Sequence, residues 1–161
     1  MIGKRLSGVP GTAVQGMVAG AVATVPMSAV MLVAGRIGAM GTQPPERVAE
    51  KAMDAAGVDD TSESEQNITA SMAHLAFGAG AGAAFTLVQR RLELPVPTVV
   101  QGVAFGLAVW AASYQGWIPA LRILPPADDD RSGRRRAMIA AHIVYGGVLG
   151  AVESRMFHSP D

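Results

Sequence analysis

The chain has no cysteine among its 161 residues. This absence excludes disulfides, thiol catalysis and every metal centre or cluster that cysteine thiolates would hold. Charge is sparse and balanced, with 13 basic and 13 acidic residues, so no overall positive field attracts nucleic acid. The sequence also contains neither a G-x-S-x-G nor an H-E-x-x-H motif. We therefore expect a protein that is not an enzyme and has no nucleic-acid partner and no metal site.

Charged residues are missing from the centres of four apolar windows, each of roughly the twenty residues that a membrane-spanning helix needs. These windows cover about 12–34, 67–88, 96–121 and 137–152. A surface helix of a soluble protein carries a charged face along its whole length, and these windows do not. The pattern predicts an all-α membrane protein with a bundle of four transmembrane helices. A soluble bundle with unusually apolar helices is the alternative.

The first loop contains a short helix, predicted from the segment ERVAEKAMDAAG that follows Pro44 and Pro45. Small apolar residues share one face of this segment, charged residues share the other, and Gly57 ends it. Small apolar side chains bind a membrane weakly. We therefore expect this amphipathic helix to cap the bundle.

Two further local features are predicted at the long helices. Pro26 falls inside the first window and should kink it, while Thr24 and Ser28 flank the kink and are expected to satisfy the freed carbonyl. Ser62 and Glu65 have the spacing of a capping box at the start of the second long helix.

Two motifs occur twice, in the same order. Q-G-x-x-x-G opens the first and third windows, and H-x-x-[Phe/Tyr]-G-x-x-x-G-A lies in the second and fourth, with a Pro-Pro pair between them. This order predicts one domain over residues 1–161, built from two parallel two-helix repeats at about 12–91 and 97–156. Small residues four apart let membrane helices approach closely. The glycines predicted to pack in this way are Gly16, Gly20, Gly78, Gly82, Gly102, Gly106, Gly146 and Gly150.

Each predicted repeat contains one histidine, His74 in the first and His142 in the second, at equivalent places in the motif. Ionisable side chains in membrane helices face the bundle interior, and the small-residue faces carry both histidines. His142 also shares a helix face with Tyr145 and Glu153. We predict a ligand or ion site near the repeat axis. The residues of this site are His74, His142, Tyr145, Gln15 and Gln101.

Several roles suit such a site, and the first expectation is a non-enzymatic structural or pore-like module. Two histidines on two bundle helices are also how membrane proteins bind haem b, which is the one cofactor alternative, with His74 and His142 as ligands. A small transporter-like protein and a lipid-headgroup-binding protein are further alternatives. The lipid bilayer is the expected partner, and the small-residue faces allow a homo-oligomer.

Four segments of the chain resemble a known family: PMSAVM, the pair Pro44-Pro45, the H-x-x-[Phe/Tyr]-G motif and SYQGWIPALRILPP. Together they are similar to YagU-like small bacterial inner-membrane proteins of unknown function. The resemblance implies a multi-pass protein of the bacterial inner membrane and assigns no catalytic residue. The orientation in the membrane stays open, because lysine and arginine occur on both sides of the predicted bundle.

Overall fold

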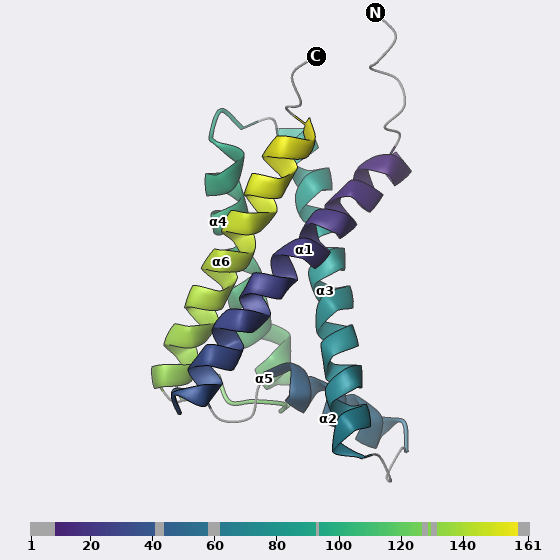
Figure 1. Cartoon of the computed structure of the whole chain (residues 1–161), viewed down its shortest axis with the longest axis vertical. Coiled ribbons are helices and arrows are strands. Elements are labelled where there is room, and N and C mark those ends of the chain that lie inside the picture. The colour runs from purple at the N-terminus through teal and green to yellow at the C-terminus, as the bar shows by residue number, and fades with distance from the viewer. Residues whose placement is uncertain are drawn as a thin grey trace, which may run out of the picture.

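The computed structural model describes residues 9–40, 44–57, 62–92, 94–126, 129 and 132–157. All regular structure in these ranges is helical, as Figure 1 shows, so the all-α prediction is confirmed. The elements are α1 (Val9–Arg36), α2 (Pro44–Ala55), α3 (Glu63–Leu92), α4 (Thr98–Ala112), the π-helix η1 (Ser113–Trp117), α5 (Ile118–Ala120) and α6 (Ser132–Phe157).

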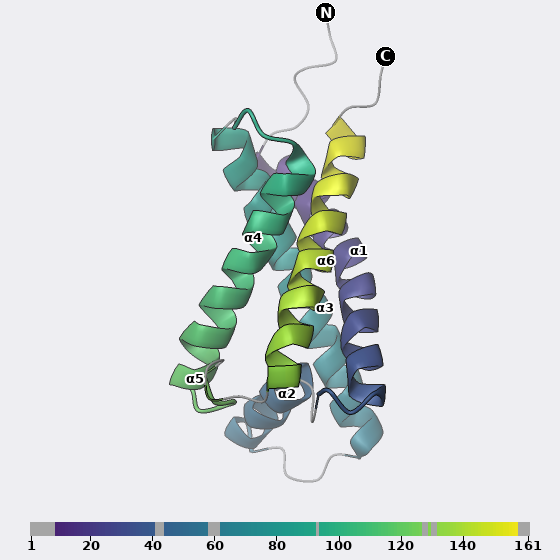
Figure 2. The same ribbon diagram turned by 90° about the vertical axis from the view of Figure 1, so that its left-hand side faces the viewer.

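The long helices run along the longest axis of the molecule, and the start of α1 and the end of α6 lie at the same end (Figures 1 and 2). Helix α2 lies at the opposite end, which we call the α2 end; the other is the terminus end. Helix α1 packs extensively against α3 and α6, and α4 packs against α6, whereas α3 and α4 make much less contact. Helices α1 and α6 therefore form the centre of the fold, with α3 and α4 on its flanks.

Three helices in the described part of the chain are long and apolar enough to cross a membrane, at Gly11–Arg36, Ser64–Leu92 and Ser132–Met156. The third predicted span is helical, but α4, η1 and α5 divide it, and α4 alone has only 15 residues. The division has a local cause. Gly116 leaves helical geometry at φ −105° and ψ −106°, and Pro119 cannot donate a backbone hydrogen bond. The third predicted window is therefore one helical segment with a break near Gly116, and the described helices do not by themselves establish a fourth membrane span.

The predicted loop helix and capping box are both present. Helix α2 ends as expected near Gly57, which has a φ of +71° that glycine adopts without strain. The backbone N–H of Ser62 donates to Glu65 Oε2 at 2.9 Å, and the N–H of Glu65 donates to Ser62 Oγ at 3.3 Å. These reciprocal bonds satisfy backbone donors at the start of α3.

The prediction for the residues around Pro26 is wrong. Thr24 donates its hydroxyl to the carbonyl of Gly20 at 2.8 Å, one turn back along its own helix, and Ser28 lies beside His74 instead. A buried threonine in a helix finds the carbonyl four residues earlier within easy reach, which explains the observed bond. Neither side chain therefore pairs with the carbonyl that Pro26 frees.

The structure places all eight motif glycines at close helix–helix contacts, four between α1 and α3 and four between α4 and α6. A Cβ atom built at Gly82 would lie 2.7 Å from the Cα of Gly20, and one built at Gly146 would lie 2.9 Å from the Cα of Val103. Real Cβ atoms essentially never come this close to backbone. Only glycine therefore permits these two helix pairs to approach so closely.

The two glycine-lined pairs differ in register by four residues. A Cβ at Gly16 would meet the carbonyl of Gly82, whereas a Cβ at Gly102 would meet the carbonyl of Gly146. In the motif, however, the counterpart of Gly82 is Gly150. The second pair is thus offset by about one helical turn. The two histidines consequently do not occupy equivalent positions against their partner helices, contrary to expectation.

Candidate functional site

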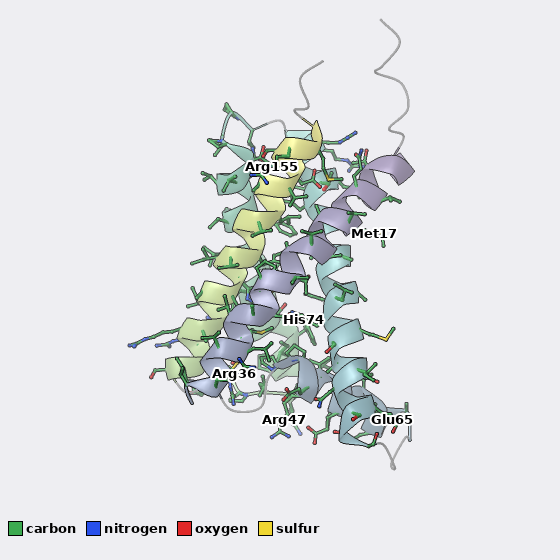
Figure 3. The ribbon with its side chains drawn as sticks, in the orientation of Figure 1. Met17, Arg36, Arg47, Glu65, His74 and Arg155 are labelled. Carbon is green, nitrogen blue, oxygen red and sulfur yellow. The ribbon has the colours of Figure 1, made fainter. Side chains whose placement is uncertain are left out.

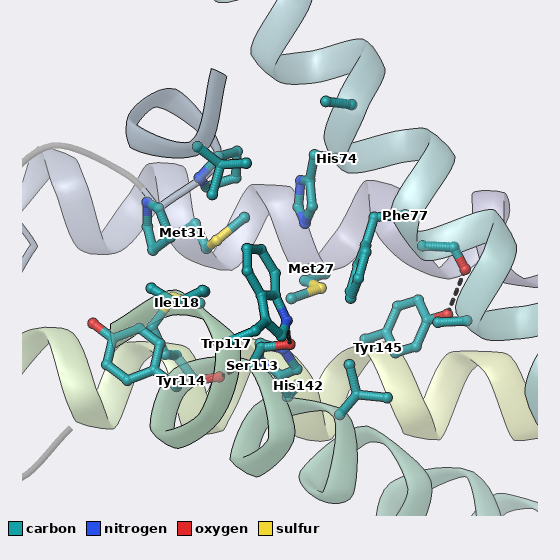
Figure 4. Close-up of a pocket in the computed structure, with 18 residues that line it drawn as sticks. Met27, Met31, His74, Phe77, Ser113, Tyr114, Trp117, Ile118, His142 and Tyr145 are labelled. Atoms are coloured by element: carbon teal, nitrogen blue, oxygen red, sulfur yellow. Dashed lines mark hydrogen bonds between the residues drawn. The ribbon is translucent and has the colours of Figure 1, made fainter. Parts of the chain in front are cut away.

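A cavity of about 180 Å³ lies at the α2 end of the bundle, lined by residues from α1, α2, α3, α4, η1, α5 and α6 (Figure 4). Its wall is mainly apolar, with methionines, aromatic rings and aliphatic side chains. Two prolines and a valine of α2 close it at that end. The polar side chains that line it belong to His74, Ser113, Tyr114, His142 and Tyr145. A small, mostly apolar space with a few polar groups has the character of a ligand site.

His142 is a firmly oriented polar group of the cavity. Its side chain is buried, and Nδ1 lies 2.8 Å from the carbonyl oxygen of Met138, one turn back along α6. A carbonyl only accepts, so Nδ1 of the neutral ring must carry the hydrogen. Nε2 then presents a lone pair, and no other group in the described part of the chain bonds to it. The ring is therefore held as a hydrogen-bond acceptor.

His74 reaches the same cavity from α3, so the structure brings the two predicted histidines together. Figure 3 shows His74 nearer to Arg36 than to Arg155, that is, toward the α2 end of the molecule. Its Nδ1 lies 3.4 Å from Ser28 Oγ, which is longer than most hydrogen bonds of this kind. His74 is thus less tightly oriented than His142, and its ring can turn toward a bound molecule.

Tyr145 lines the cavity with its ring, while its hydroxyl serves another purpose. The hydroxyl donates to the carbonyl oxygen of Gly78 at 2.6 Å and so joins α6 to α3 (Figure 4). The side chain is 2% exposed, and its one hydroxyl hydrogen is engaged in this bond. Tyr145 therefore acts chiefly as a link between helices that also shapes the cavity wall.

The side of the cavity between α3 and η1 is bounded by Phe77 and Trp117. Their ring centroids are 6.2 Å apart with the planes tilted by 49°, and the two residues are 48% and 38% exposed. The indole N–H of Trp117 donates to Ser113 Oγ at 3.3 Å across the π-helix. Single-turn π-helices often occur at functional sites. Here η1 turns both Ser113 and Trp117 toward the cavity.

The structure does not bring Gln15 and Gln101 to this cavity. Gln101 donates to the carbonyls of Val96 and Leu94, at 2.6 and 3.3 Å, and so stabilises the turn before α4. Gln15 accepts from Arg90 at 3.5 Å. Each glutamine lies near the terminus end of its helix, more than a dozen residues from the α2 end and thus about 20 Å away at 1.5 Å per residue.

Sequence reasoning missed several residues that form the cavity, including Met27, Met31, Met138 and Ser113. Methionines scattered through apolar helices give no periodic signal that separates them from ordinary core residues. One signal was available for Ser113, because a glycine and a proline follow it closely and mark a break in helical geometry.

The fold and cavity describe an all-helical protein with three helices able to cross a membrane and a mainly apolar cavity at the α2 end. Residues 11–161 match the family described as "Family of unknown function (DUF6789)", and the chain belongs to that family. No curated protein and no solved structure matches the chain. The family assigns no activity, so the cavity itself must indicate the function.

Proposed function

We propose that this chain is a non-enzymatic membrane protein that binds a small, mainly apolar molecule carrying one hydroxyl group. The observation that carries the proposal is the orientation of His142. Its Nδ1 hydrogen is engaged by the carbonyl of Met138, so Nε2 offers one acceptor inside an otherwise apolar cavity. A ligand hydroxyl that donates to Nε2 satisfies this acceptor, while the rest of the ligand replaces water against apolar walls.

A membrane location is supported by the apolar side chains that the fold leaves on its outer surface. Val25, Val33 and Met72 are 67%, 56% and 66% exposed, along helices that are themselves apolar. Exposed apolar surface on this scale is costly in water and favourable in lipid. We propose that all four long helical segments cross the bilayer, with the divided segment α4–η1–α5 as the third span. Its π-helix then lies beside the cavity, where Ser113 and Tyr114 are buried, and the kink at Gly116 is exposed toward the α2 end.

The repeated motifs and the matching glycine contacts support an internal duplication, with the second copy shifted by one turn. The proposed kinship with YagU-like proteins and the bacterial inner membrane still rest on the sequence resemblance. A second copy of the chain is not needed to build the cavity, because one chain supplies all of its walls.

Haem b fits this site poorly. Sites for drug-sized ligands occupy about 300–1,000 Å³, and haem is at least of that size. The cavity has about 180 Å³, which favours a ligand smaller than haem. A pore through one chain also has little support, since Tyr145 and the packed rings of Phe85 and Phe105, 5.3 Å apart, lie between the cavity and the terminus end.

A pair of matched probes tests the proposed function. An apolar cavity of about 150 Å³ accepts benzene, so a single substituted ring is of suitable size. 4-Fluorophenol and 4-fluorotoluene have nearly the same shape, but only the first can donate a hydrogen bond. We expect ¹⁹F NMR of the protein in detergent micelles to show saturable binding of both, with empty micelles as the blank. The phenol should bind roughly three- to tenfold more tightly, the value of one hydrogen bond.

The variant His142→Leu separates the hydrogen bond from the cavity. Leucine fills a similar space but has no hydrogen-bond acceptor. The preference for 4-fluorophenol should therefore disappear, while 4-fluorotoluene should still bind. A wild-type protein that binds neither probe, or that binds both with equal affinity, would show that the cavity does not select a hydroxyl group. Ser71→Ala, which removes a hydroxyl from the exposed side of α3 outside the cavity, serves as a control and should keep the preference.

A further inference from the structure

A second polar site, separate from the histidine cavity, lies at the terminus end around Glu153. This glutamate is 0% exposed although it sits in the last turns of α6, near the chain end. It lines a wider cavity whose other walls come from the end of α3, the link to α4 and the start of α4. The polar residues of that cavity include Gln89, Arg90, Thr98, Gln101 and Ser154. A buried carboxyl group thus borders a polar space near the end of the bundle.

The hydrogen bonds of Thr86 indicate whether the carboxyl group of Glu153 is protonated. Thr86 Oγ1 lies 2.6 Å from Glu153 Oε1 and 3.0 Å from the carbonyl oxygen of Gly82. Its hydroxyl has one hydrogen for these two oxygens. If Glu153 is protonated, its O–H donates to Thr86 and the threonine donates to Gly82, so one relay serves both contacts. If Glu153 is ionised, one of the two contacts lacks a hydrogen.

The second carboxylate oxygen of Glu153 also favours the protonated acid. Oε2 of Glu153 is buried and has no hydrogen-bond partner in the described part of the chain. An ionised carboxylate accepts about four hydrogen bonds, and burying its charge with one partner is very costly. A neutral acid leaves only an uncharged carbonyl oxygen to be accommodated, which costs far less.

Among the described residues, the helices packed around this site carry few charged groups, and α3 has Arg90 and Arg91 in its last turn. Helix α3 brings Arg90, whose charge acts on the carboxyl group. Within its described residues α1 has one charged side chain, Arg36, at the far end, and α4 has none. On α6 itself the nearest charged residue, Arg155, is exposed. Arg90 is therefore the cation toward which an ionised Glu153 would turn.

We propose that Glu153 is a proton-binding site that exchanges with water through the cavity at the terminus end. In the arrangement seen here it holds the proton as a carboxylic acid that donates to Thr86. The proton links α6 to α3, because Thr86 belongs to the first helix pair and Glu153 to the second. Release of the proton breaks this relay and lets the carboxylate turn toward Arg90. The site is independent of the ligand proposed for the histidine cavity.

Infrared spectroscopy of this chain in lipid vesicles at neutral pH tests the proposal. The spectrum of each variant is subtracted from that of the wild type. The C=O stretch of a protonated carboxylic acid is distinct from the bands of a carboxylate. We expect the wild type to show one acid band that is lost in Glu153→Gln. Glu50→Gln is the matched control, since Glu50 lies on the exposed face of α2, and it should leave the acid band unchanged.

Thr86→Val provides a second route if Glu153→Gln does not fold. Valine has the shape of threonine without the hydroxyl, so the acid loses its acceptor and its C=O band should shift while remaining present. An infrared spectrum of the wild type with no acid band at neutral pH would overturn the proposal. So would an acid band that neither substitution changes.

Discussion

The glycine contacts between α1 and α3 lead to a sharp prediction, because α3 offers a control glycine two residues away. Gly82→Ala places a Cβ 2.7 Å from the Cα and 2.8 Å from the N of Gly20, and still closer to the carbonyl of Gly16. Ordinary van der Waals contact begins at 3.4 Å. All three neighbours are backbone atoms and cannot swing aside, so the two helices must separate. Gly80→Ala meets nothing within 4 Å.

The two substitutions are expected to change the free energy of unfolding in opposite directions. Extra atoms in a well-packed interface typically cost about 1–3 kcal/mol. Replacing glycine by alanine inside a helix gains about 1 kcal/mol of intrinsic propensity, and only this gain applies at the open position. The free energy of unfolding of Gly82→Ala should therefore lie roughly 1–3 kcal/mol below that of Gly80→Ala, because the propensity gain applies to both substitutions and cancels. The intrinsic gain offsets part of the cost at Gly82, so comparison with Gly80→Ala isolates the contact itself.

The assay is reversible unfolding of both variants in mixed micelles with increasing SDS, followed by circular dichroism. Both proteins have the same composition and the same added methyl group, so differences in detergent binding cancel. Equal unfolding midpoints for Gly82→Ala and Gly80→Ala would refute the close approach of α1 and α3. A Gly82→Ala protein more stable than the control would refute it more strongly.

Three further results are expected from other parts of the fold. In the same SDS assay, Gly146→Ala should be less stable than Gly147→Ala. A Cβ at Gly146 meets the backbone of α4, whereas a Cβ at Gly147 makes only ordinary contact with a side chain. Equal unfolding midpoints would argue against the α4–α6 contact. Tyr145→Phe loses one bond to the α3 backbone and should cost about 0.5–1.5 kcal/mol, so an unchanged midpoint would mean that the bond contributes nothing. Because the native chain lacks cysteine, single cysteines at Gly57 and Leu94 can be labelled with an impermeant maleimide, and four spans require them to react from opposite sides of the membrane.

Local sequence patterns were sufficient to predict much of the helical framework. Uncharged stretches of membrane-spanning length, the Ser62–Glu65 capping box and the loop helix ending near Gly57 each depend on residues close together in the chain. The glycines also reach the predicted kind of contact, since spacing four residues apart marks a small-residue face whatever helix covers it. The break at Gly116 in the third span was not predicted, although Gly116 and Pro119 mark it in the sequence.

The pairing between helices could not be predicted in the same way. When glycine recurs every four residues on both partners, a slide of one turn again sets glycine against glycine, so the sequence leaves the register of α4 on α6 undecided. The observed register determines how deep His142 lies, and the direction of each helix determines that Gln15 and Gln101 lie at the other end. Identical motif positions therefore do not imply identical surroundings.

Long apolar segments, helical structure and histidines on small-residue faces could all be read from the sequence, because periodicity is a property of single helices. Only the tertiary structure decided which distant residues meet: His74 with His142 at one cavity, and Thr86 with Glu153, 67 residues apart, at the other end. These pairings follow from side-chain packing between helices, where many registers have similar energy until every contact is counted together.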